Sequence, residues 1–141
     1  MKRVLAFDVG DKRIGVAVSD ALGITAQPVE TYHRKGGAEK DAEYLLALAR
    51  KYAPCTLLFG LPRNMDGTYG EQAEKVKKFA QRLIDRWDGD YAFYDERLTT
   101  MAARRVLLDA DISREKRKQV IDKMAAVVIL QGYMESHRDQ L

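Results

Sequence analysis

Residues 4–20 read VLAFDVGDKRIGVAVSD, two apolar runs separated by a short polar turn. The first run, Val4 to Phe7, is apolar without alternation, which predicts a strand covered on both faces. The second run, Ile14 to Ser19, alternates branched apolar residues with small ones. Its small-residue face would let another backbone or a substrate come close. The two runs therefore predict the centre of a sheet.

Asp8 stands at the end of the first predicted strand, directly after four apolar residues. An ionised carboxylate beside a buried strand is costly to remove from water unless a cation compensates its charge. Asp8 is therefore the first candidate for a functional residue.

The rest of the chain predicts an α/β fold. A third strand over about 24–32 contains Pro28, which cannot donate to a sheet hydrogen bond and so favours an edge. Apolar runs and helical spacing then predict, in order, a helix closed by Pro54, a strand over 56–60, a helix over about 71–87, a strand over 91–94, a helix from Thr99 or Thr100 to about Leu108, and a helix over about 113–136. This order predicts a mixed sheet, with an antiparallel neighbour on one side of the first strand and parallel neighbours on the other.

The composition favours one domain, 1–141, in the cytoplasm. The chain has a single cysteine, Cys55, so neither a disulfide framework nor a zinc site built from cysteines is available. This usage fits a reducing compartment. No apolar stretch is long enough to cross a bilayer, so a membrane partner is not expected.

The net charge is only +3, but basic residues concentrate in one region. Residues 97–123 contain eight lysines and arginines against four acidic residues. Such a local excess suggests a polyanionic partner, although a solvated helix face would explain the same pattern.

Two further acids could join Asp8 at one edge of the sheet. Parallel strands end at the same edge, where ligands bind, and Glu96 follows the last predicted strand. Asp122 lies on one helical stripe with Ala125, Ala126 and Ile129. An acid on a core-facing stripe is unusual unless it is paired or bound to a cation. A salt bridge from Asp122 to a neighbouring lysine is an equally good explanation of that residue taken alone.

Three converging carboxylates would form a hard oxygen site suited to Mg²⁺ or Mn²⁺. Two such ions about 3.5–4 Å apart can hold the attacking and leaving oxygens of a phosphoryl displacement. The pattern therefore predicts a metal-dependent hydrolase acting on phosphodiester bonds.

Four blocks of sequence resemble the YqgF/RuvX family. They are Asp8-Val9-Gly10 with Arg13 to Asp20; Gly60-Leu61-Pro62 with 65–68 and Gly70; Asp95 to Thr100; and Asp122 with Ala125-Ala126 and Ile129 to Gln131. The blocks stand in the family's order and span nearly the whole chain.

This resemblance implies an RNase H-like three-layer fold, shared with RuvC Holliday-junction resolvases. Its five-stranded mixed sheet would have the order 3-2-1-4-5, with helices on both faces. The implied function is a nuclease that processes the 5′ end of pre-16S rRNA during ribosome biogenesis. The alternatives are a Holliday-junction resolvase acting on branched DNA and a nucleic-acid-binding factor without catalysis. An actin-like phosphotransferase would share Asp8-Val9-Gly10 but needs two such domains.

The resemblance also assigns the site. Asp8, Glu96 and Asp122 fall on the catalytic, metal-binding acids. RuvC-type sites often have a fourth acid near the third, and Lys123 stands beside Asp122 instead, so a second metal would be weak or held mainly by substrate. Asp95 and Glu96 should point to opposite faces of their strand, and the motif favours Glu96.

The predicted partners are nucleic acid and either a second copy of the chain or a ribosomal precursor particle. Contacts to nucleic acid are expected from six basic residues, namely Arg13, Arg63, Arg97, Arg104, Arg114 and Lys118.

Overall fold

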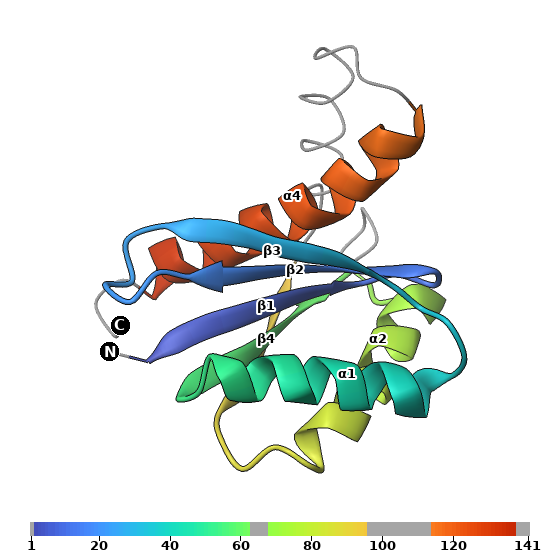
Figure 1. Cartoon of the computed structure of the whole chain (residues 1–141), viewed down its shortest axis with the longest axis horizontal. Coiled ribbons are helices and arrows are strands. Elements are labelled where there is room, and N and C mark those ends of the chain that lie inside the picture. Colours follow the sequence, from blue (N-terminus) through green and yellow to red (C-terminus); the bar gives the residue numbers. More distant parts are fainter. Residues whose placement is uncertain (1, 63–67, 96–113, 138–141) are drawn as a thin grey trace.

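The computed structural model of the chain describes residues 2–62, 68–95 and 114–137, without the side chains of residues 114–123. The described part forms three layers, with one helix on one face of a sheet and two on the other (Figure 1). The strands are β1 (Arg3–Val9), β2 (Arg13–Ser19), β3 (Ala26–His33), β4 (Cys55–Leu61) and β5 (Tyr91–Asp95). The helices are α1 (Ala38–Lys51), α2 (Glu71–Ile84) and α4 (Arg114–Ser136).

The sheet has the predicted strand order β3-β2-β1-β4-β5. β2 is antiparallel to both β1 and β3, while β4 is parallel to both β1 and β5. β3 is an edge strand, as Pro28 predicted, and its pairing with β2 shifts register between Val16 and Ala17. The mixed sheet predicted from the sequence is thereby confirmed.

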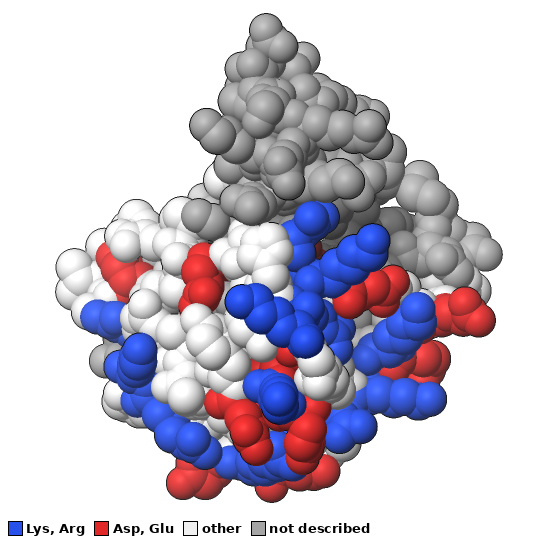
Figure 2. Space-filling view, turned by 45° about the vertical axis from the view of Figure 1, so that its right-hand side comes forward, with Lys and Arg blue, Asp and Glu red and all other residues white. Residues whose placement is uncertain are grey.

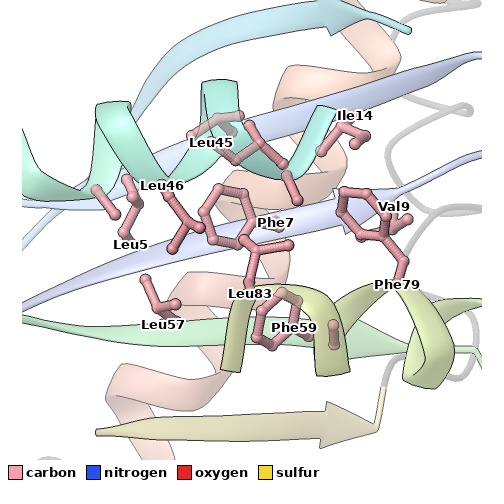
Figure 3. Packing of buried hydrophobic residues seen from close by; sticks show 14 of the residues in the cluster. Leu5, Phe7, Val9, Ile14, Leu45, Leu46, Leu57, Phe59, Phe79 and Leu83 are labelled. Carbon is pink, nitrogen blue, oxygen red and sulfur yellow. The ribbon is translucent and has the colours of Figure 1, made fainter. Parts of the chain in front are cut away.

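β1 is covered on both faces, as its unbroken apolar run predicted. On one face Leu5 and Phe7 belong to a core formed with α1 and α2 (Figure 3). The rings of Phe7 and Phe59 lie 5.4 Å apart within this core. On the other face Val4 and Ala6 pack against α4. Every second residue of β1 therefore contacts a different helical layer.

The small-residue face of β2 lies against α4. Ala17 is fully buried in the cluster that α4 forms with the sheet. Ser19 is 2% exposed, and its Oγ accepts a hydrogen bond of 2.7 Å from the backbone nitrogen of Val4. Small side chains here let the helix approach the sheet closely, so the close neighbour expected from the sequence is α4.

α2 ends at Ile84, three residues before the predicted end at Trp87. The backbone nitrogens of Arg86 and Trp87 donate to the carbonyl oxygens three residues earlier, which tightens the chain into turns. Trp87 nevertheless packs against the core, so its apolar side chain continued the helical pattern beyond the helix. No helix within the described residues has the length and apolarity required to span a membrane.

Candidate active site

Asp8 lies near the carboxyl end of β1, at the edge where the parallel strands β1, β4 and β5 all end. It is half-buried. Because Val4 and Ala6 pack against α4, the alternation along the strand puts Asp8 on the same face of the sheet as α4. The acid singled out from the sequence therefore lies at this edge of the sheet, on the face that α4 covers.

Glycines flank Asp8 on both neighbouring strands. Gly15 of β2 is its cross-strand partner. β1 and β4 pair Phe7 with Phe59, so the same register continued by one residue puts Gly60 opposite Asp8. A strand glycine permits close approach of a ligand to the backbone. Asp8 thus has a residue without a side chain next to it on each neighbouring strand.

Arg13 shares this face of the sheet, because it alternates with Ile14 and lies two residues before Gly15 in β2. Its carbonyl oxygen accepts a hydrogen bond of 2.9 Å from the backbone nitrogen of Gly10, which closes the β1–β2 turn. A Cβ on Gly10 would lie 2.8 Å from that oxygen. The tight turn that brings Arg13 close to Asp8 therefore requires glycine at position 10.

Asp95 is the last residue of β5 and lies on the opposite face from Asp8. Phe93, two residues earlier, has its ring 5.7 Å from that of Phe59 in the core beneath α1 and α2. The exposed Asp95 carboxylate accepts a hydrogen bond of 3.1 Å from the hydroxyl of Tyr69. Glu96 lies outside the described residues, so its placement beside Asp8 stays a prediction.

The apolar stripe predicted on the last helix is confirmed for Ala125, Ala126 and Ile129, which are all fully buried. Tyr133 is partly buried against the same cluster. Asp122 lies on α4 one turn before Ala125 and Ala126, but its side chain is outside the described part of the structure. Its role as a metal ligand stays a prediction.

Most of the predicted nucleic-acid contacts also fall outside the described residues. Arg63, Arg97 and Arg104 do so entirely. Arg114 and Lys118 are placed by their backbone on the N-terminal part of α4. Among the described side chains, no three from His, Cys, Asp and Glu come together as metal ligands. Asp8 is the one member of the predicted acid triad that the structure describes in full.

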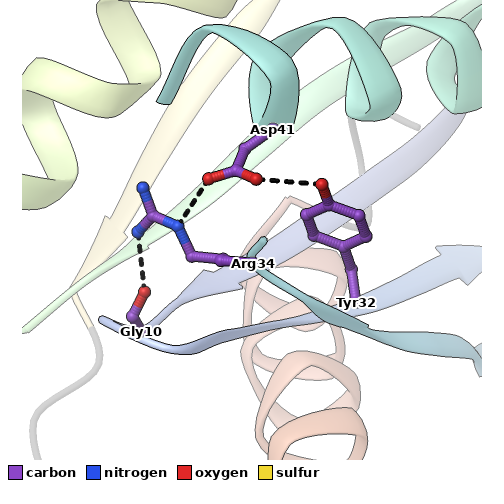
Figure 4. A network of polar contacts seen from close by, with 4 residues as sticks. All are labelled: Gly10, Tyr32, Arg34 and Asp41. Carbon is purple, nitrogen blue, oxygen red and sulfur yellow. Dashed lines mark hydrogen bonds and ion pairs between the residues drawn. The ribbon is translucent and has the colours of Figure 1, made fainter. Parts of the chain in front are cut away.

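A buried polar network behind the Gly10 turn did not emerge from the sequence (Figure 4). Asp41 of α1 is 1% exposed. The Arg34 Nε donates to Asp41 Oδ2 at 2.9 Å, and Arg34 Nη1 donates to the Gly10 carbonyl oxygen at 2.8 Å. The Tyr32 hydroxyl donates to Asp41 Oδ1 at 2.9 Å. The network ties α1 and the end of β3 to the turn that follows Asp8.

The network also changes the acidity of Tyr32. Burial, together with the hydrogen bond to the Asp41 carboxylate, raises the pKa of the Tyr32 phenol to about 12. One sequence signal could have found Asp41, since it lies four residues before Leu45 on the core-facing stripe of its helix. An acid on such a stripe normally has a buried partner.

The chain is similar to proteins of one family along nearly its whole length. A family model described as "RuvX: Holliday junction resolvase" matches residues 2–136. A protein of Clostridium novyi named "Putative pre-16S rRNA nuclease" is 52% identical over 134 residues, which cover 95% of this chain and 98% of the relative. A protein of Halalkalibacterium halodurans with the same name is 51% identical over 140 residues, covering 99% of each.

Solved structures show the same fold. RuvC of T. thermophilus, in complex with a Holliday junction substrate, has a TM-score of 0.60 at 13% sequence identity, and the match covers 99% of this chain and 98% of RuvC. The sheet order, the three layers and this match confirm the RuvC-like, RNase H-like architecture predicted from the sequence. With the family model spanning nearly all of its length, the chain belongs to the RuvX family.

Proposed function

We propose that this protein is a metal-dependent endonuclease that hydrolyses phosphodiester bonds in nucleic acid. Its substrate is the 5′ region of pre-16S rRNA, processed in the cytoplasm during ribosome biogenesis. The observation that carries the proposal is the position of Asp8, half-buried between two strand glycines at the carboxyl edge of the parallel strands. Relatives named for this substrate match the chain at about half of all positions over nearly its full length.

The donor set fits a hard divalent cation. Carboxylate oxygens are the ligands that Mg²⁺ and Mn²⁺ prefer. Asp8 offers such oxygens at a sheet edge where the flanking glycines leave the backbone approachable. Asp8, Glu96 and Asp122 would hold the ion. When bound, it would polarise the phosphate and lower the pKa of a water that serves as nucleophile.

Several residues of the chain would then hold the substrate or keep the site in position. Arg13 shares the face of Asp8 and would hold the scissile phosphate through its guanidinium. The Arg34 bond to the Gly10 carbonyl would keep the turn between Asp8 and Arg13 in place. Basic residues at positions 63, 97, 104, 114 and 118 would bind backbone phosphates on either side.

Branched DNA is the second candidate substrate, favoured by the description of the matching family model. Symmetric cleavage of a junction requires two active sites, so this function would need a dimer. A binding factor without catalysis would keep the fold but would not need the acids. Which nucleic acid the protein cleaves, if it cleaves one, therefore distinguishes these three functions.

The test is a cleavage assay on two substrates, a transcript carrying the 5′ leader of 16S rRNA and a synthetic four-way DNA junction. We expect cleavage of the transcript near the mature 5′ end with Mg²⁺ or Mn²⁺ and none with a chelator. Cleavage of the junction alone would replace the proposed substrate. Cleavage that survives the chelator would refute the metal mechanism.

The acid triad is tested by Glu96→Gln and Asp122→Asn, with Asp95→Asn as the matched control. Each triad variant should cleave at least about 100-fold more slowly, because a charged group that acts on the transition state is lost. Each should also bind Mn²⁺ more weakly in a calorimetric titration. Asp95 lies on the opposite face, bonded to Tyr69, so its variant should keep both properties. Equal losses in all three variants would reject the assignment of Glu96 and Asp122.

A further inference from the structure

A cavity of about 510 Å³ opens beside the Gly10 turn, on the face of the sheet opposite to Asp8. It lies between the Gly10 turn, the start of α1 and one side of α2. Its wall carries four cationic side chains, Arg34, Lys75, Lys78 and Arg82, against two acids, Asp11 and Asp41. None of these six residues belongs to the predicted acid triad or to the basic residues already assigned to nucleic acid.

Arg34 is the fixed element of this wall. Two of its guanidinium nitrogens donate to Asp41 and to the Gly10 carbonyl oxygen (Figure 4), and the third donates no hydrogen bond to any described residue. The guanidinium carbon lies 4.8 Å from the ring centre of Phe79 on α2, so α2 also limits its movement. A guanidinium held in place with donors to spare is well suited to a phosphate.

The α2 side of the cavity carries a row of cations. Lys75, Lys78 and Arg82 are spaced by three and four residues, which puts them on one side of the helix. Lys78 has no ion-pair partner among the described residues. Lys75 lies 3.6 Å from Asp11, with both side chains more than half exposed, and such pairs contribute little. These two lysines can therefore bind a phosphate without losing a strong ion pair.

The surroundings of the cavity contain both signs of charge. Figure 2 shows lysine and arginine side chains gathered on this side of the molecule, interleaved with acids. Glu39 of α1 pairs with Arg82 and with Arg86. Asp41 is neutralised by Arg34. Lys75 and Lys78 thus carry the positive charge most accessible to a ligand.

We propose that this cavity binds successive backbone phosphates of the nucleic-acid strand that is cleaved at Asp8, an inference that rests on the proposed function. Gly10 in its wall is only two residues from Asp8, about 7 Å along an extended chain. A strand passing over the carboxyl edge of the sheet would meet both sites. The positive row from position 75 to 82 is about 10 Å long, which suits successive phosphates rather than one. Phe79 is 4% exposed and has Arg34 over its ring, so that ring offers no platform for the base of a free nucleotide.

The test compares two double variants of the full-length protein. Lys75→Gln/Lys78→Gln removes two charges from the cavity, and Arg50→Gln/Lys51→Gln removes two from the far end of α1. The probe is a fluorescently labelled single-stranded RNA, titrated in the presence of a chelator at several salt concentrations. We expect the cavity variant to bind about tenfold more weakly, with a salt slope smaller by about 1.4 units, or about 0.7 per lost contact. The control should change less than twofold.

Three outcomes would overturn the proposal. Equal weakening in both double variants would mean that only the overall positive charge matters. Binding of a mononucleotide or inorganic phosphate to the wild type as tightly as RNA, lost in the cavity variant, would mean that the cavity takes a soluble phosphate and not a strand. Because binding is measured without metal, it is independent of catalysis. A wild type that binds through the lysines but never cleaves would reject the proposed function alone, whereas a cleaving enzyme whose cavity variant binds normally would reject this site alone.

Discussion

At the scale of single residues, the ion pair between Arg34 and Asp41 is the most consequential interaction that the structure adds. Asp41 is 1% exposed, and the side chain of Arg34 is 20% exposed. A buried carboxylate that loses its cationic partner keeps an uncompensated charge, which strongly destabilises the fold. The pair therefore matters for stability and also for the position of the turn after Asp8, because Arg34 holds the Gly10 carbonyl.

Arg34→Ala should lower the free energy of unfolding by about 3 kcal/mol, because it leaves the Asp41 carboxylate buried without its cation. Urea unfolding followed by circular dichroism measures this. Lys35→Ala, an exposed neighbour, is the matched control and should stay within about 0.5 kcal/mol of the wild type. If the two variants unfolded alike, the buried pair would not be a stabilising element.

The raised pKa of Tyr32 makes the network detectable in a pH titration. Its pKa of about 12 in the folded protein lies above the ordinary value of 10.0 for tyrosine. A raised pKa contributes stability that is complete below pH 10 and is lost as the pH rises from 10 toward 12. Ultraviolet titration of the phenolates should show a late step near pH 12. Tyr32→Phe should remove that step, and a late step that persisted in the variant would assign it to another tyrosine.

At the scale of elements, the packing of α4 on the sheet depends on a glycine. A Cβ added to Gly132 would lie 2.4 Å from the hydroxyl oxygen and 2.8 Å from Cζ of Tyr94. The tyrosine extends from β5 and packs against the cluster beneath α4. Gly132 therefore leaves room for the Tyr94 ring of β5 beneath α4, a helix that packs mainly on β1, β2 and β3.

Gly132→Ala should destabilise the protein by about 1 kcal/mol, because the cost of displacing the ring exceeds the gain in helix propensity. With Tyr94→Ala in the background, the same substitution should instead stabilise it by about 1 kcal/mol. Chemical unfolding of the four proteins in this cycle measures the coupling. Additive effects of the two substitutions would show that the close contact has no energetic consequence.

Much of the sheet could be predicted because its signals are local. The unbroken apolar run of β1, the alternation in β2 and the proline in β3 each report how a strand is covered, and together they predicted the mixed sheet around β1. The full strand order was predicted from the resemblance to the YqgF/RuvX family. The end of α2 was wrong because Trp87 packs on the core from beyond the helix. Periodicity reports which side chains are buried, and it does not report where the backbone hydrogen bonds stop.

The candidate site also combines residues that local sequence patterns predict with contacts that they do not. Asp8 could be singled out because a charge after a buried strand needs a partner. The Arg34–Asp41 pair and the contact between Gly132 and Tyr94 join segments distant in sequence, so no local pattern specifies them. Only the core-facing spacing of Asp41 gave a usable hint. The basic row on α2 carries no signal in the sequence that separates it from an ordinary solvated helix face, because the cavity beside it is formed with α1 and the Gly10 turn, which are distant in sequence.

At the scale of the whole molecule, the two candidate sites lie on opposite faces of the sheet at its carboxyl edge. Asp8 lies on the side of α4, and the basic cavity lies on the side of α1 and α2. Asp8 and Asp95 mark the two faces at this edge, and each is the last acid of its strand. They are therefore a matched pair with which the proposed catalytic role of Asp8 can be tested.

The most direct test of the central claim is the single-turnover rate of metal-dependent cleavage by Asp8→Asn, compared with Asp95→Asn. Both variants should keep the wild-type fold by circular dichroism. Asp8→Asn should cleave about 1,000-fold more slowly than the wild type, because the ligand of the metal and its negative charge are lost. Asp95→Asn should cleave within about threefold of the wild type, because Asp95 bonds to Tyr69 on the opposite face. A wild-type rate in Asp8→Asn, or equal losses in both variants, would contradict the account.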